Sequence, residues 1–218
     1  TSGTDLIHRA EGKSVHAIGT PLITNSDGTK FGKSEGNAVW LDASMTSPYA
    51  FYQFWLNTDD ADVIDRIKVF TFLTRAEIEE LAQQVADEPF KRAAQRRLAL
   101  EVTSLVHGED ATQAAIAAAA ALFGQGELAE LDSATLEAAL RELPHTTTPA
   151  NTPVAQLLVD TGLSQSLGAA RRSIAEGGVY LNNEKVAAED ELLEAHVLAS
   201  KMAVLRRGKK TLAGVFVE

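Results

Sequence analysis

The sequence predicts a mainly α-helical protein that ends in a small α+β domain. Between about residues 46 and 143, apolar residues recur at helical spacing, and helix-capping residues precede several of these runs. Residues 154–218 instead combine two short helical runs with strand-like runs that are separated by glycine and asparagine turns. A segment rich in proline and threonine, residues 144–153, lies between these regions and is predicted to be a flexible linker.

The composition is that of an ordinary soluble globular chain, since 45% of the 218 residues are hydrophobic and 23% are charged. No apolar run reaches the roughly 20 residues of a membrane span. The chain has no cysteine, which excludes disulfides and thiolate metal sites. Its five histidines are scattered, so we expect no metal site. This residue usage fits a cytoplasmic protein.

The net charge of −10 is unevenly distributed. Residues 1–149 hold 12 Lys and Arg against 22 Asp and Glu, whereas residues 150–218 hold 8 of each. Within the second part, the run from Lys201 to Lys210 has five basic residues and no acidic one. Because phosphate contacts are short-ranged at cellular salt, such a basic patch can bind a polyanion even on an acidic protein.

Capping signals and apolar spacing locate the helices of the middle region. Ser47 is the expected N-cap of a helix whose first residue is Pro48, and Thr74 with Glu77 forms a capping box. After Pro89, one helix is predicted from an apolar stripe. The stripe consists of Phe90, Ala94, Leu98, Val102, Leu105 and Val106.

Two further helices are predicted before the linker. The run "DATQAAIAAAAALF" favours a helix through its alanine content. A last short helix, capped by Asp132 or Ser133, is expected to end near Pro144.

The two ends of the chain show different patterns. From Thr1 to about Ser44 we expect strand-like runs and turns, with a short strand at Ala38–Asp42. In the last region, "VAQLLVDTG" and "SLGAARRSIAEGG" are typical of short helices that end at glycine. The run "VYLNNEKV" predicts a hairpin around residues 182–184, and "AVLRRGKKTLAGVFV" predicts two strands that turn at Gly208.

The stretch "DGTKFGKSEGN" is a near match to a Walker A phosphate loop, but two observations exclude that motif. Only three residues separate Gly28 from Gly32, where four are needed, and a turn and strand rather than a helix are expected to follow. Lys30 and Lys33 could instead bring two ammonium groups to one polyphosphate, with Gly32 allowing the backbone to bend. A solvated turn that carries two lysines is the alternative on spacing alone.

The passage "PLITNSDGTKFGKSEGNAVWLDASMTSPYAFYQFWLNTDD" resembles bacterial tyrosine–tRNA ligases, a family of class I aminoacyl-tRNA synthetases. In that family a KMSKS-type signature has the form Lys-Phe-Gly-Lys-Ser/Thr, followed by a Trp-Leu-Asp strand. The resemblance continues through "KRAAQRRLALEVTSLVHGE" to "LRRGKK" and so covers essentially the whole chain. It implies the end of a Rossmann-type catalytic domain (1–45), an α-helical anticodon-recognition domain (46–143), a linker (144–153) and an RNA-binding domain like ribosomal small-subunit protein four (154–218).

The resemblance also implies roles for individual residues. The signature loop would close over ATP, with Lys30, Lys33 and Ser34 as catalytic residues and Lys30, Gly32, Lys33 and Ser34 binding ATP. RNA-binding residues are implied on the second helix of the last domain and near the turn at Gly208. They are Ser164, Ser166, Arg171, Arg172, Arg206, Arg207, Lys209 and Lys210.

One position departs from the family pattern. Family members often carry Lys or Arg just after the position of Ser166, whereas Leu167 and Gly168 follow it here. More of the RNA contact is therefore expected from Arg171, Arg172 and the C-terminal basic cluster.

The implied reaction joins tyrosine to tRNA(Tyr) through a tyrosyl-adenylate. ATP would be a substrate with Mg²⁺, and no tightly bound cofactor and no membrane partner are expected. No His-Ile-Gly-His-like motif occurs, so we expect the C-terminal half of such an enzyme, inactive alone, whose parent dimerises through an absent N-terminal domain. A free-standing adaptor for structured RNA is the alternative, but it leaves Lys30–Ser34 and Trp40–Asp42 unexplained.

Overall fold

The computed structural model describes residues 2–20, 22–26, 28–31, 39–188, 190–209 and 211–218. It divides into two compact units, Thr1–Ala38 and Val39–Glu218. None of the helices in the described ranges has the length and apolar character to cross a membrane.

The first unit contains a helix that the sequence analysis did not predict. Helix α1 (Ser2–Glu11) carries an Asp5–Arg9 ion pair at 3.0 Å, one helical turn apart. Residues 12–20 have no regular structure, and an isolated antiparallel bridge joins Thr24 to Lys30. None of the described residues of this unit is buried, so local interactions such as the Asp5–Arg9 ion pair, rather than core packing, stabilise α1.

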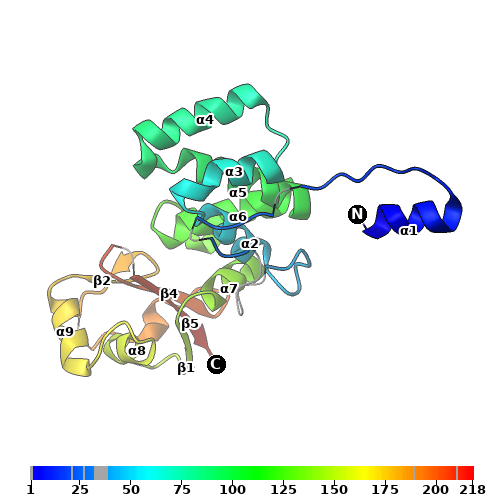
Figure 1. Ribbon diagram of the computed structural model, residues 1–218. Coiled ribbons are helices and arrows are strands. Elements are labelled where there is room, and N and C mark those ends of the chain that lie inside the picture. The colour runs from blue at the N-terminus through cyan, green and yellow to red at the C-terminus, as the bar shows by residue number, and fades with distance from the viewer. Residues whose placement is uncertain (1, 21, 27, 32–38, 189, 210) are drawn as a thin grey trace. The chain divides into compact units, whose positions relative to one another are not determined.

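The second unit begins with a helical part (Figure 1). Its elements are α2 (Pro48–Leu56), α3 (Asp60–Phe70), α4 (Arg75–Asp87), the 3₁₀ turn η1 (Pro89–Lys91), α5 (Ala93–His107), α6 (Glu109–Leu122), the 3₁₀ turn η2 (Leu128–Glu130) and α7 (Ser133–Arg141). Helix α5 packs against α2, α3, α4 and α6 and so forms the centre of this part. The buried core of the helical part includes Phe51, Ile67, Leu98, Ala118 and Leu122.

The predicted helix caps are confirmed. The Ser47 side chain accepts a hydrogen bond from the Ala50 amide at 3.1 Å, and Thr74 and Glu77 form both bonds of a capping box. Of the two candidates for the last cap, Asp132 is the N-cap of α7. Each bond satisfies a backbone N–H that has no partner within its own helix.

The helix predicted from the apolar stripe starts later than expected. Phe90 lies in η1 with 79% of its surface exposed, and α5 begins only at Ala93. Arg92, at a left-handed φ of 50°, separates the two elements. Its Nη2 donates to the carbonyl oxygens of Leu56 and Thr58 at 2.7 and 3.2 Å. These two bonds across the bundle compensate for the unfavourable backbone conformation.

A strand was predicted at Ala38–Asp42. Ala38 lies outside the described residues, and for the other four residues the prediction is wrong. Residues 39–42 have no strand pairing. The carbonyl oxygen of Asp42 instead accepts from the amides of Met45 and Thr46, each at 3.0 Å, and its carboxylate accepts from Ser44 N. This side-chain turn ends any extended run before α2 begins.

The rest of the second unit is a five-stranded sheet with two α-helices. The elements are β1 (His145–Thr148), α8 (Val154–Asp160), α9 (Leu167–Ala175), β2 (Val179–Leu181), β3 (Glu184–Lys185), the 3₁₀ turn η3 (Leu193–Ala195), β4 (Met202–Arg207) and β5 (Thr211–Val217). The strand order is β1-β5-β4-β2-β3, with β1 parallel to β5 and the other pairs antiparallel. The predicted turns are confirmed, with positive φ at Asn182, Asn183 and Gly208.

One face of the sheet forms a core with α8 and α9. This core includes Leu157, Leu158, Ile174, Ala203 and Leu205, all buried. In the view of Figure 1, β4 and β5 lie between α8 and α7.

The segment predicted as a flexible linker contains β1, so it is not an unstructured connection. Residues His145–Thr148 pair with Gly214–Val217, and the Gly214 amide donates to the Pro144 carbonyl at 2.9 Å. Three consecutive threonines favour an extended strand. The prediction of a linker gave more weight to the neighbouring prolines than to these threonines.

Candidate functional site

The two-lysine loop is described only at its first lysine. Lys30 is exposed and lies opposite Thr24 in the isolated bridge. The turn before it is closed by Asn25, whose amide nitrogen donates to the Thr29 carbonyl at 2.8 Å. The remaining signature residues, Gly32, Lys33 and Ser34, lie outside the described residues. The described part therefore offers one exposed ammonium group at the end of a tight turn.

Helix α9 presents two arginines to solvent. Ser166 caps it, with its Oγ accepting from Ala169 N at 3.3 Å. Arg171 and Arg172 are exposed, and within the described ranges no acidic side chain pairs with either of them. The buried face of the helix carries Ile174, which anchors it to the core. Two unpaired guanidinium groups on one exposed helix surface are well suited to contact phosphates.

Ser164 does not share this surface. Only 4% of its area is exposed, and its Oγ is buried. The Ser164 amide donates to the Leu158 carbonyl at 2.7 Å, which folds the α8–α9 loop back onto α8. Sequence proximity to the start of α9 suggested a surface position, but this loop turns the side chain inward. The burial of Ser164 removes the physical basis for an RNA contact.

The C-terminal basic cluster is divided between the two faces of the sheet. Arg207 follows Leu205 by two residues and so lies on the face covered by α8 and α9, where its Nη1 donates to the Leu163 carbonyl. The guanidinium carbon of Arg206 instead lies 4.1 Å from the ring centroid of Tyr180. Lys209 is exposed after the Gly208 turn, and Lys210 lies outside the described residues. Arg207 and the α9 arginines therefore share one side, and Arg206 does not.

A partly buried polar network, which the sequence analysis did not identify, supports the same domain. The ring of His196 contacts the Glu191 carboxylate through Nε2, and its Nδ1 lies 3.5 Å from the Glu184 carboxylate. Burial raises the pKa of Glu191, but the bonds from His196 and from the amides of Ala187 and Ala188 outweigh it and hold the pKa below its usual range. The side chains of Glu184, Glu191 and His196 lie five or more positions apart, so no regular spacing reveals them.

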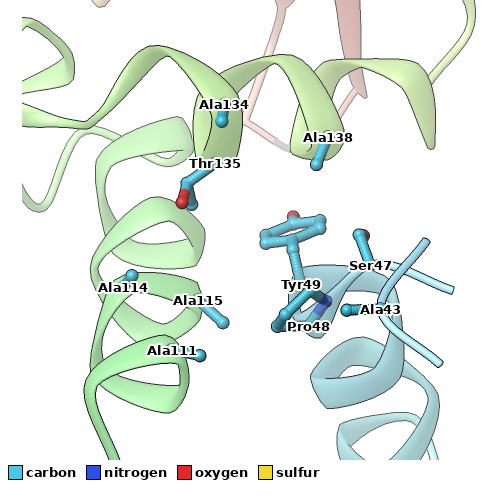
Figure 2. Close-up of a pocket in the computed structure, with 10 residues that line it drawn as sticks. All are labelled: Ala43, Ser47, Pro48, Tyr49, Ala111, Ala114, Ala115, Ala134, Thr135 and Ala138. Carbon is cyan, nitrogen blue, oxygen red and sulfur yellow. The ribbon is translucent and has the colours of Figure 1, made fainter. Parts of the chain in front are cut away.

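A pocket of about 260 Å³ lies between α2, α6 and α7. Figure 2 shows the Tyr49 ring projecting from α2 toward α7, among small side chains. Burial, followed by the charge of Glu142, raises the pKa of Tyr49 to about 12, so its hydroxyl stays protonated. The lining residues are Ala43, Ser47, Pro48, Tyr49, Ala111, Ala114, Ala115, Ala134, Thr135 and Ala138. With no charged group in its lining, the pocket is unsuited to a nucleotide.

The described residues contain no group of three His, Asp or Glu that could hold a metal ion. Of the residues predicted to bind phosphate, those that are described and exposed include Lys30 in the first unit and Arg171 and Arg172 in the second. All three are suited to binding phosphate.

Family models and curated relatives of this chain all belong to the tRNA synthetases. The family model described as tRNA synthetases class I (W and Y) matches residues 1–124, and that of the tyrosine–tRNA ligase SYY-like C-terminal domain matches residues 135–214. A tyrosine–tRNA ligase of Leifsonia xyli is 67% identical over 100% of this chain and 50% of its own length. One of Streptomyces avermitilis is 59% identical over 100% of this chain and 52% of its own.

A solved structure of a C-terminally truncated mitochondrial tyrosyl-tRNA synthetase from Coccidioides posadasii also matches. It is 42% identical, covers 45% of this chain and 25% of its own, and has a TM-score of 0.39. The chain spans about half the length of the curated relatives it matches.

Proposed function

The chain belongs to the tyrosine–tRNA ligase family of class I tRNA synthetases, and from this premise we propose that it serves an enzyme that attaches tyrosine to tRNA(Tyr). In the proposed reaction, tyrosine attacks the α-phosphate of ATP, which releases pyrophosphate and forms tyrosyl-adenylate. The tyrosyl group then passes to the terminal ribose of the tRNA and AMP leaves. The 67% identity over the whole chain to a tyrosine–tRNA ligase is the observation that carries this proposal.

The proposed role of the first unit is to neutralise charge on the triphosphate. Lys30 and Lys33 would bind the phosphates, with Ser34 and the backbone at Gly32 supporting the loop. Negative charge grows on the departing pyrophosphate, so an ammonium group placed there stabilises the transition state more than the ground state. The exposed position of Lys30 at the end of a closed turn supports this role. Mg²⁺ would arrive with ATP, bound to the nucleotide.

The proposed role of the second unit is to bind tRNA. Residues 46–143 would recognise the anticodon, and residues 154–218 would bind the RNA backbone. The unpaired, exposed Arg171 and Arg172 support this assignment most directly. Ser166, Arg207, Lys209 and Lys210 complete the proposed surface, whereas Arg206, which lies over Tyr180 on the other face of the sheet, is not part of it.

The remaining properties of the parent enzyme are also proposals. The segment alone would not activate tyrosine, the parent would be a homodimer through its other half, and it would work in the cytoplasm with the bacterial tRNA pool. A parent of twice this length is consistent with the curated relatives, of which this chain covers about half.

Competitive tRNA binding tests the assignment. We expect the protein to bind a tyrosine tRNA more tightly than a non-cognate tRNA of equal length, at several salt concentrations. Equal affinity for both RNAs at every salt concentration would favour the alternative, an adaptor for structured RNA. Tyrosine-dependent ATP–pyrophosphate exchange by the parent enzyme tests the catalytic role separately.

A further inference from the structure

Four basic residues lie between positions 91 and 97, where α5 begins, and the structure gives them different surroundings. The Lys91 ammonium lies 2.6 Å from the Glu88 carboxylate, and Arg97 pairs with two glutamates at 3.2 and 2.7 Å. Arg92 donates to two backbone carbonyl oxygens. Arg96 is exposed, and no acidic side chain within the described ranges forms an ion pair with it. Arg96 therefore presents a guanidinium group to solvent without a compensating charge.

An exposed aromatic ring lies just before the same helix. Phe90, in η1, has 79% of its surface exposed, although it belongs to the apolar stripe from which the helix was predicted. The buried face of α5 starts only with Ala94 and Leu98. Because the Phe90 ring gains nothing from burial in the core, it is available as a contact surface.

The corner of the chain between Phe90 and Arg96 is held in a fixed shape. Arg92 has a left-handed φ of 50°, which is unfavourable for a residue with a Cβ atom. Its bonds to the Leu56 and Thr58 carbonyls, at 2.7 and 3.2 Å, hold it in this conformation. The Arg96 amide donates to the Arg92 carbonyl at 3.0 Å, so Arg96 lies one helical turn beyond the corner. Backbone strain that the surrounding structure maintains in this way is concentrated at functional sites.

We infer that Phe90 and Arg96 form a contact site for one unpaired nucleotide of a bound RNA, with the base stacked on the Phe90 ring and a phosphate on the Arg96 guanidinium. An exposed aromatic ring together with a free cation is the combination with which proteins bind single-stranded nucleic acid. An apolar protein partner would instead cover Arg96 without compensating its charge, which is unfavourable. The identity of the RNA as tRNA(Tyr) rests on the proposed function, whereas the site itself rests on the exposure and pairing of these residues.

Substitutions at exposed positions test the ring and the charge separately. Phe90→Leu removes the ring but keeps an apolar side chain, and Phe90→Tyr keeps the ring. Phe72→Leu is the control, because Phe72 is 89% exposed in the connection between α3 and α4. Arg96→Gln removes the charge, and Arg75→Gln is its control, because Arg75 is exposed and pairs with Glu79 at 2.7 Å. Since all of these side chains lie at the surface, we expect the urea midpoint of each variant to match that of the native chain.

Binding of a tyrosine tRNA at several salt concentrations measures both contributions. We expect Phe90→Leu to bind about tenfold more weakly than Phe72→Leu with an unchanged salt slope, and Phe90→Tyr to bind like the native chain. Arg96→Gln should lower the salt slope by about 0.9, whereas Arg75→Gln should leave it unchanged. The proposal is overturned if Phe90→Leu binds as tightly as Phe72→Leu, or if Arg96→Gln keeps the native slope.

A short single-stranded RNA and its fully paired duplex distinguish stacking from general attraction to phosphate. We expect Phe90→Leu to weaken binding of the single strand but not of the duplex, because the bases of a duplex are already stacked on each other. Equal weakening of both would overturn the stacking role of Phe90. If the native chain shows no preference for the tyrosine tRNA but Phe90→Leu still weakens binding of the single strand, the proposed function is refuted and the site is supported.

Discussion

Arg206 and Tyr180 lie directly opposite each other in the β2–β4 pair, and the guanidinium carbon lies 4.1 Å from the centroid of the tyrosine ring. The Arg206 side chain is half-buried and its Nε is enclosed, whereas neighbouring Arg207 is exposed on the other face. Two adjacent arginines in one basic run thus have different surroundings. The sequence alone gives no reason to distinguish them, but substitution of Arg206 should have a different effect from substitution of Arg207.

We expect Arg206→Ala to lower the free energy of unfolding by about 1 kcal/mol through loss of the contact with Tyr180. The salt slope of RNA binding should change little, and urea titration together with binding at several salt concentrations measures both effects. A fall in that slope by about one unit would show that Arg206 binds a phosphate.

Replacing Arg171 and Arg172 together with Gln should lower the salt slope of tRNA binding by about two units, because each lost phosphate contact contributes roughly 0.9. Stability should be unchanged, since both side chains are exposed. Arg75→Gln is the matched control, because Arg75 is exposed on α4 and pairs with Glu79 at 2.7 Å. If the double variant and the control show the same slope, the RNA surface lies elsewhere.

In the parent enzyme, Lys30→Ala should slow tyrosine activation by roughly 10²-fold, as expected for loss of one group that stabilises charge in a transition state. ATP–pyrophosphate exchange measures this rate. Lys13→Ala removes an exposed lysine of the same unit and should leave the rate unchanged. Equal rates in the two variants would argue against a catalytic role for Lys30.

The Glu191 network predicts a stability that falls in acid. A carboxyl whose pKa is lower in the folded than in the unfolded chain contributes stability above its unfolded pKa, and this stability is lost as the pH falls through the folded pKa. Glu191→Gln should remove about 1–3 kcal/mol near neutral pH and flatten the acid decline. Glu194→Gln, at an exposed position nearby, is the control. Urea denaturation between neutral pH and the acid limit measures both curves, and parallel curves for Glu191→Gln and the native chain would contradict this account.

Arg92→Ala should destabilise the helical part by about 1–3 kcal/mol, because the carbonyls of Leu56 and Thr58 lose a charged donor. Arg96→Ala, one turn along and exposed, should change stability by less than about 0.5 kcal/mol. Thermal denaturation of the two variants compares them directly. Equal loss in both would mean that the Arg92 bonds contribute nothing.

What the sequence predicted correctly depends on signals within a few residues. The cap at Ser47, the capping box at Thr74 and the turn at Gly208 each follow from neighbouring side chains and backbone preferences, so they appear as predicted. The pairing of β1 depends on residues more than 60 positions away, in β5. No local pattern contains that information, and the prolines on both sides of β1 favoured a linker.

In the candidate site, too, local features were predictable from the sequence and features that depend on tertiary contacts were not. The exposure of Arg171 and Arg172 follows from the apolar face of α9, which the sequence reveals. The burial of Ser164 follows from how a loop folds over α8, and the stacking of Arg206 follows from a cross-strand neighbour. Both depend on tertiary contacts, and neither could be predicted from spacing.

The pairing of β1 with β5 also affects the order in which the parts of a newly synthesised chain can fold. The ribosome produces β1 before α8, α9 and β2–β4, and its partner β5 follows all of these elements in the chain. Until then the nascent chain carries three threonines in a strand without its neighbour, while the helices before it can already fold. Closure of the sheet is therefore a late step, and a message that stops before Thr211 would yield folded helices joined to an open sheet edge.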